Sequence, residues 1–84
     1  MVHQYASPAV DGPRIRALRI QSGLSVTGLA RRIGITPQYL SQIENEHRPT
    51  VSPQTFAKFL VAMGVEDREI LKPAATSGDS RSVA

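Results

Sequence analysis

The chain has 84 residues, of which 40% are hydrophobic, and a formal net charge of +3, which together predict one small domain. It has no Cys, which excludes disulfides and thiolate metal sites, and its apolar runs are too short to cross a membrane. Residues 1–10 have neither the basic start nor the apolar run of a signal peptide, so we expect a cytoplasmic protein.

The two ends of the chain differ from its middle. Residues 1–12 contain Pro8 and Gly12 and show no sustained period, and residues 73–84 are small and polar. A segment with so few apolar groups cannot offset the entropy lost on ordering. We therefore expect a flexible N-terminal segment over 1–12, a folded domain over 13–72 and a disordered tail over 73–84.

The first half of the expected domain contains two short helices. The first covers residues 13–21 and begins with a proline, whose missing N–H costs nothing at this position. The second covers residues 26–33, with Ser25 as its N-cap and Gly34 as its end.

Three further helices complete the domain. Thr-Pro and Ser-Pro pairs open the third and fourth, over residues 37–45 and 53–63, each with a hydroxyl N-cap and a first-turn proline. The fourth has apolar residues at helical spacing, namely Phe56, Phe59, Leu60 and Met63. A short fifth helix over 67–71 would cover the core with Ile70 and Leu71. Few alternating β-branched residues occur, so we predict an all-α fold.

The connection between the second and third helices is very short. Only Gly34 and Ile35 separate Ile33 from Thr36. Glycine can take the left-handed conformation that ends a helix abruptly, and Ile35 can pack down while the chain restarts in a new direction. Two helices joined in this way form a helix-turn-helix, although ordinary helical corners in all-α domains share the pattern.

The outward side of the third helix favours a helix-turn-helix over an ordinary helical corner. Leu40 and Ile43 should face inward, and the other side has no charge before Glu44. That side consists of Gln38, Tyr39, Ser41, Gln42 and Asn45. Gln38 and Gln42 are four residues apart and so lie one above the other. A glutamine amide both donates and accepts, which matches adenine N6 and N7 in the major groove of DNA; a merely solvated polar face is the plainer alternative.

Charge is unevenly distributed along the chain. Between Gly12 and Ile43 there is no acidic residue, and the basic residues there are Arg14, Arg16, Arg19, Arg31 and Arg32. Every acidic residue except Asp11 lies at or after Glu44. A basic half suits binding to a polyanion such as nucleic acid.

Three segments add a more specific signal: IRALRIQSG, GLSVTGLARRIGITPQYLSQIEN and SPQTFAKFLVAMGV. Together they closely resemble the Cro/C1-type (Xre-like) helix-turn-helix family of bacterial and phage repressors, over roughly residues 13–71. The resemblance implies a compact, five-helix, lambda-repressor-like domain that binds double-stranded operator DNA with its third helix in the major groove and regulates transcription, by repression. One recognition helix reads few base pairs, so we expect a homodimer on DNA. The resemblance also implies that a bacterium or a phage encodes the protein.

The resemblance also implies roles for individual residues. Base-contacting positions fall on Pro37, Gln38, Tyr39 and Gln42. Of these, Pro37 could offer only apolar contact, as to a thymine methyl group. Phosphate contacts are expected from Ser25, Thr27, Thr36, Ser41, Asn45 and Arg48. Arg19 and Glu44 match a structural ion pair rather than a DNA contact.

The sequence departs from the family pattern at three positions. Val26 replaces the usual Gln that supports the recognition helix, so this support is lost or comes from Thr27. Gly28 replaces a Glu and removes the capping box. Glu46 replaces a Gly, so the third helix must end through Asn45 or through a strained residue.

Other functions find less support. His3 and His47 have no ligand or triad spacing, and there is no glycine-rich phosphate loop, so we expect no enzyme, cofactor or metal. The rival is an antitoxin-type protein-interaction module with the same fold, which binds a partner protein through a terminal extension with apolar anchors. Only Val2, Tyr5 and Val83 could supply such anchors.

Overall fold

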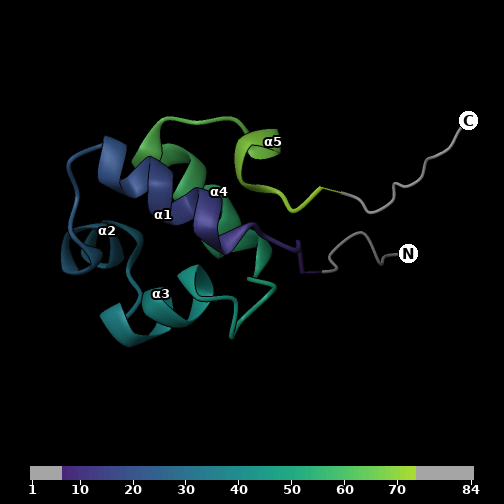
Figure 1. The fold of residues 1–84 in the computed structure, drawn as a ribbon, viewed down its shortest axis with the longest axis horizontal. Helices are drawn as coiled ribbons and strands as arrows, with labels where there is room; N and C mark the ends of the chain where they lie inside the picture. Colours follow the sequence, from purple (N-terminus) through teal and green to yellow (C-terminus); the bar gives the residue numbers. More distant parts are fainter. Residues whose placement is uncertain (1–6, 74–84) are drawn as a thin grey trace, which may run out of the picture.

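A computed structural model describes residues 7–73, and within them the chain forms five helices and no strand (Figure 1). The helices are α1 (Gly12–Gln21), α2 (Val26–Ile33), α3 (Pro37–Glu44), α4 (Pro53–Met63) and α5 (Asp67–Ile70). The all-α, five-helix prediction is therefore confirmed, with each helix boundary within one residue of its expected place. None of the helices in this range has the length and apolar run needed to cross a membrane.

Side-chain caps explain where the helices begin. A side-chain oxygen accepts a hydrogen bond from the backbone N–H three residues further on at Asp11, Ser25, Thr36 and Ser52. Such a bond satisfies one of the N–H groups that the first turn of a helix leaves without a partner. Three of the four caps were predicted, and Asp11 was missed because we placed it in a flexible segment.

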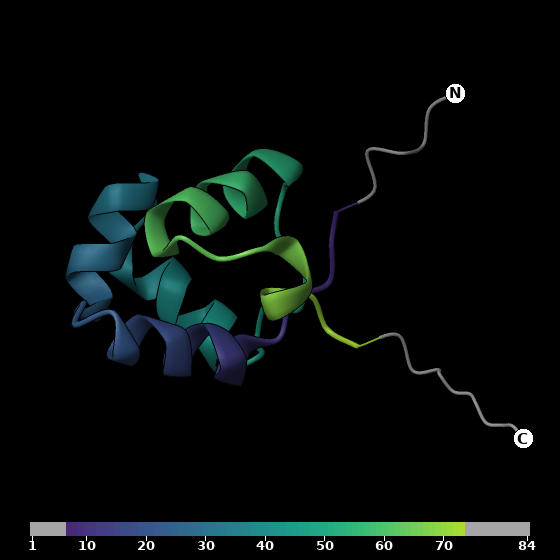
Figure 2. The ribbon, with the colours of Figure 1, turned by 90° about the horizontal axis from the view of Figure 1, so that it is seen from above.

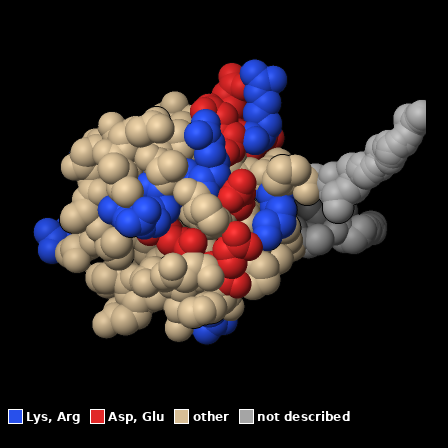
Figure 3. All heavy atoms as spheres, in the orientation of Figure 1, with Lys and Arg blue, Asp and Glu red and all other residues tan. Residues whose placement is uncertain are grey.

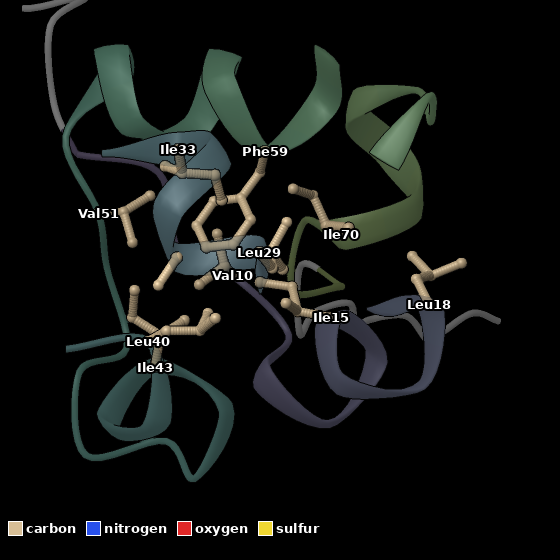
Figure 4. Close-up of a cluster of buried hydrophobic side chains, with 11 residues drawn as sticks. Val10, Ile15, Leu18, Leu29, Ile33, Leu40, Ile43, Val51, Phe59 and Ile70 are labelled. Atoms are coloured by element: carbon tan, nitrogen blue, oxygen red, sulfur yellow. The ribbon is translucent and has the colours of Figure 1, made fainter. Parts of the chain in front are cut away.

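The core lies where the five helices meet (Figure 4). Phe59 projects from α4 into its centre and is fully buried, as are Leu40 and Ile43 of α3. The other apolar residues that follow the helical spacing of α4, Phe56, Leu60 and Met63, are partly buried and pack against the core. Leu71 is 36% exposed. The expectation that it covers the core is wrong, since α5 ends at Ile70, which takes the inward position.

Residues 8–12, which we expected to be flexible, belong to the fold. Val10 is 1% exposed. Its N–H donates to the Pro49 carbonyl (2.9 Å), and the Asp11 N–H donates to the Ile70 carbonyl (2.8 Å). Residues 8–11 lie extended between the α3–α4 loop and the end of α5. Only one of their large side chains is buried, so the sequence contained no repeating apolar pattern that would have marked the segment as ordered. The prediction of a flexible segment over 1–12 is wrong for these residues.

The described part of the chain stops short of both ends. The rest of the expected flexible segment, with Val2, His3 and Tyr5, lies outside the described residues, as does the expected disordered tail after Pro73, with Val83. Where the described chain ends, both ends leave the domain on the side away from α2 (Figure 2).

The chain leaves α3 through Asn45 and then a strained residue, so both of the routes that the sequence left open are used. Asn45 caps the helix, and Glu46 follows at a φ of 65°, a left-handed conformation that costs a non-glycine residue about 1–2 kcal/mol. Its carboxylate accepts a hydrogen bond from Lys72 Nζ (2.7 Å). The end of α3 is thereby linked to the segment after α5.

This ion pair predicts a pH effect. The hydrogen bond to Glu46, and then its charge, raise the pKa of Lys72 above the ordinary value of 10.5. Because the pKa is higher in the folded state, the pair stabilises the fold below the unfolded-state pKa, and this contribution is lost as pH rises through the folded-state pKa. We expect an NMR titration of the Lys72 side chain to give a pKa above 10.5 and Glu46→Gln to lower it. Equal pKa values in both proteins would show that the pair does not persist in solution.

Candidate nucleic-acid interface

The turn between α2 and α3 has the geometry of a helix-turn-helix. Gly34 caps α2 with a φ of 86°, and its N–H donates to the Ala30 carbonyl (2.8 Å). The Ile35 N–H donates to the same carbonyl (3.0 Å), and the side chain packs against the core. Thr36 then caps α3, which leaves in a new direction (Figure 1). The predicted roles of the glycine and the isoleucine are confirmed.

The outward face of α3 is polar and accessible. Four of its side chains are exposed, namely Gln38, Ser41, Gln42 and Asn45, and Tyr39 is partly buried. Pro37 at the start of the helix is exposed as well. On the side of the molecule seen in Figure 3, the part over α3 is almost entirely uncharged. Since Leu40 and Ile43 point into the core, both glutamine side chains lie on the side of α3 that is accessible to another molecule.

A buried ion pair fixes the other side of α3. Arg19 Nε and Nη2 donate to the two carboxylate oxygens of Glu44 (2.7 and 3.1 Å), and Nη1 donates to the Leu24 carbonyl (2.9 Å). The side chains of Arg19 and Glu44 are only 9% and 4% exposed. Such a two-point contact is geometrically specific, and here it ties α1 and the following loop to the end of α3. The expected pair is thus present, on the core side of α3.

Backbone contact between α1 and α3 is unusually close at Gly12. A Cβ atom at this position would lie 2.2 Å from the Ile43 carbonyl oxygen and 2.8 Å from that of Glu44. Only a residue without a side chain fits there. Sequence reasoning placed Gly12 in a flexible segment and gave no sign of this contact.

Three of the four hydroxyl groups expected to hold phosphate lie at helix starts, and the fourth, that of Ser41, lies within α3. Ser25 Oγ accepts from the Gly28 N–H (2.9 Å) and Thr36 Oγ1 from the Tyr39 N–H (3.0 Å). Each hydroxyl hydrogen can still be donated to a phosphate oxygen. Thr27 is exposed in the first turn of α2, and in the described part of the chain its side chain makes no hydrogen bond to α3. It therefore does not replace the support lost with the usual glutamine.

Asn45 and Arg48 lie just after the glutamines. Asn45 Nδ2 donates to the Ser41 carbonyl (2.9 Å) and lies 3.3 Å from Ser41 Oγ. Arg48 Nε donates to Gln42 Oε1 (3.1 Å), and its guanidinium carbon lies 5.7 Å from the centroid of the Tyr39 ring. The sequence did not reveal the contacts of Arg48, because a loop residue has no period that could relate it to a helix face.

Two of the five arginines in the basic half of the sequence have acidic partners. Arg19 is buried against Glu44, and Arg14 Nη2 lies 3.9 Å from Glu69 Oε1. Arg31 and Arg32, at the end of α2, are exposed and form no ion pair within residues 7–73. Fewer arginines are available to a polyanion than the sequence suggested.

The turn, the capped helices and the exposed amide face define the helix-turn-helix class of DNA-binding domains. The chain belongs to the helix-turn-helix family of the Cro/C1 type, whose model matches residues 15–70.

Solved structures with this fold are similar over most of the chain. One is the restriction-modification controller protein C.AhdI from Aeromonas hydrophila, at 36% identity and a TM-score of 0.64, covering 69% of this chain and 86% of that one. Another is SinR, the master regulator for biofilm formation, in complex with DNA, at 32% identity and a TM-score of 0.64, covering 68% and 90%.

Curated relatives are similar over a shorter stretch. The transcriptional regulator PrpR of Mycobacterium tuberculosis is 36% identical over 47 residues, which are 56% of this chain and 10% of PrpR. The regulator RamB of the same species is 47% identical over 38 residues, which are 45% of this chain and 8% of RamB. This chain thus matches a tenth or less of the length of these regulators.

Proposed function

We propose that the protein is a sequence-specific DNA-binding regulator that represses transcription by occupying its operator, with α3 in the major groove. The observation that carries this proposal is the exposure of Gln38 and Gln42 on an uncharged helix face. Glutamine is a base reader, because its amide pairs with two atoms of a base edge at once. The protein would act in the cytoplasm of a bacterium, encoded by the bacterium or by a phage, and would catalyse no reaction.

Contacts to bases and to phosphates would divide along α3. Pro37, Gln38, Tyr39 and Gln42 would face bases, since the N-terminal part of a recognition helix enters the groove. The phosphate contacts would come from Ser25, Thr27, Thr36, Ser41, Asn45 and Arg48. The exposed hydroxyl groups of Ser25 and Thr36 at the starts of α2 and α3 support the phosphate contacts, because helix N-termini attract anions.

Specific binding would require two copies of the chain. The eight residues of α3 span only about 12 Å, so one copy reads few base pairs. A homodimer would place two such helices about 34 Å apart, one turn of DNA. The outer face of α4, with Val61 83% exposed and Ala57 exposed, supports a dimer surface from α4 onward.

Selection of bound fragments from random duplex DNA tests the proposal. We expect a recurrent motif of two related half-sites whose centres lie about 10 base pairs apart. Recovery of fragments without any shared motif would contradict sequence-specific binding.

Each glutamine should contribute to base preference. We expect Gln38→Ala and Gln42→Ala each to weaken binding to the selected duplex by about 1–3 kcal/mol and to relax the preference at one base pair. Fluorescence titrations with duplexes altered at one position measure both effects. Gln21→Ala, at an exposed glutamine outside α3, should leave base preference unchanged. An equal loss on every duplex would mean that the α3 glutamines contact only the backbone of the DNA.

A protein-binding module is the second candidate. The chain is 30% identical to a chain of a SinR–SinI protein complex, at a TM-score of 0.69, covering 82% of this chain and 67% of that one. The exposed Val61 and Ile20 would suit an apolar partner surface. Co-purification of a second polypeptide with a tagged copy, in an amount equal to the bait, would favour this candidate.

A further inference from the structure

The loop after α3 is joined to the proposed reading face at several points. Besides the bond from Arg48 Nε to Gln42 Oε1, the backbone N–H groups of His47 and Arg48 donate to the Gln42 carbonyl (2.8 and 3.1 Å). The Arg48 guanidinium also lies within the range of a cation–π contact with Tyr39, at 5.7 Å. Arg48 is therefore held against α3 by its own backbone and by two contacts of its side chain.

This contact determines which end of the Gln42 amide faces Arg48. A guanidinium has only donors, so the atom that it meets must be the amide oxygen. One of the two acceptor sites of the Gln42 amide oxygen is thereby occupied, whereas both N–H donors of its amide nitrogen stay available to a ligand. Gln38 has no such side-chain partner within the described residues, so both ends of its amide stay available.

We propose that Arg48 is a positioning residue that sets the base preference of Gln42. It holds Gln42 so that the side chain meets DNA as a donor, which favours guanine, whose major-groove edge presents the acceptors N7 and O6. Adenine, which presents N6–H₂ beside N7, would be disfavoured at this position, in contrast to the adenine pairing expected for a free glutamine amide. The inference rests on the proposed function, since it requires that α3 reads bases.

Arg48→Lys separates this role from a simple phosphate contact. Lysine keeps the positive charge but lacks the planar Nε–H group and stacks differently on an aromatic ring. If Arg48 served only as a phosphate contact, lysine would largely replace it. If Arg48 orients Gln42, lysine would keep general affinity and lose the base preference.

The test is a selection from random duplexes with the wild type, Arg48→Lys, Gln42→Ala and the control Arg68→Lys, whose residue is exposed on α5. We expect guanine at one position of the wild-type motif and a fall of about fivefold or more in that preference in Arg48→Lys. Gln42→Ala should lose the same position, and Arg68→Lys should lose none. The salt dependence of binding should be unchanged in Arg48→Lys, because the charge is kept.

A measurement without DNA provides a second readout. The side-chain amide of Gln42 should become more mobile in Arg48→Lys than in the wild type, as measured by ¹⁵N NMR relaxation, while that of Gln38 stays the same. A wild-type base preference in Arg48→Lys, adenine at the Gln42 position, or an unchanged Gln42 mobility would overturn the inference and leave the proposed function standing. Absence of any motif in the wild-type selection would overturn both.

Discussion

Glu44→Ala should lower the free energy of unfolding by about 3–5 kcal/mol, because it leaves the Arg19 guanidinium buried without its carboxylate. Such a charge is expensive because the buried surroundings do not solvate it as water would. Urea unfolding followed by circular dichroism measures the change. For a domain of this size, a loss of that amount is a large part of the whole stability.

Two controls separate burial from charge. Arg68→Ala removes one partner of the Glu66–Arg68 pair, whose side chains are 69% and 84% exposed, and it should change stability by less than about 1 kcal/mol. Replacing both partners together, as Arg19→Met with Glu44→Leu, should recover most of the loss, since an apolar pair leaves no buried charge. If Glu44→Ala had no more effect than Arg68→Ala, the Arg19–Glu44 pair would not hold α3 as described.

Gly12→Ala should destabilise the protein by about 1–3 kcal/mol and move α3 away from α1. The added Cβ atom would overlap two backbone carbonyl groups, the nearer at 2.2 Å, and backbone cannot rotate aside as a side chain can. Because those carbonyls belong to the C-terminal end of α3, the proposed reading face would shift with them. Thermal unfolding and the affinity for the selected duplex should therefore both fall.

Gly28→Ala is the matched control. It lies inside α2, and the nearest atom to its added Cβ is the Ser25 hydroxyl oxygen at 3.2 Å. That side chain can give way, and alanine favours a helix over glycine, so the change should be below about 1 kcal/mol. Equal losses for Gly12→Ala and Gly28→Ala would mean that the close approach of α1 and α3 does not exist in solution.

The features that the sequence predicted correctly are local. Ser25, Thr36 and Ser52 cap helices through bonds to residues three positions away, so a short stretch of sequence contains both partners. The outward direction of Gln38 and Gln42 followed from helical period alone, because their neighbours Leu40 and Ile43 had to face the core.

The features that the sequence missed depend on single residues far apart in the chain. Val10 reaches the core from an extended segment whose partners lie beyond α3 and after α5. Gly12 meets carbonyls more than thirty residues away. Neither position belongs to a repeating pattern, and a contact of this kind becomes visible only when the chain is folded.

The contact of Arg48 with Gln42 joins residues only six positions apart, yet it was missed as well. Helical spacing relates residues on one helix, and Arg48 lies beyond the end of α3, where the direction of the chain depends on the left-handed Glu46. The resemblance implied that this arginine contacts a phosphate group. Its contact with Gln42 supports a second role, the positioning of that side chain, which the family motif does not contain.

The most direct test of the proposed reading face is an NMR titration of the protein with its selected duplex. We expect the side-chain amide signals of Gln38 and Gln42 to move, and the backbone signals of α5, on the side of the domain away from α3 (Figure 1), to stay in place. An unrelated duplex at the same salt concentration should leave the two side-chain signals where they are. Signals that move on another face while both glutamine amides stay unchanged would contradict DNA reading by α3.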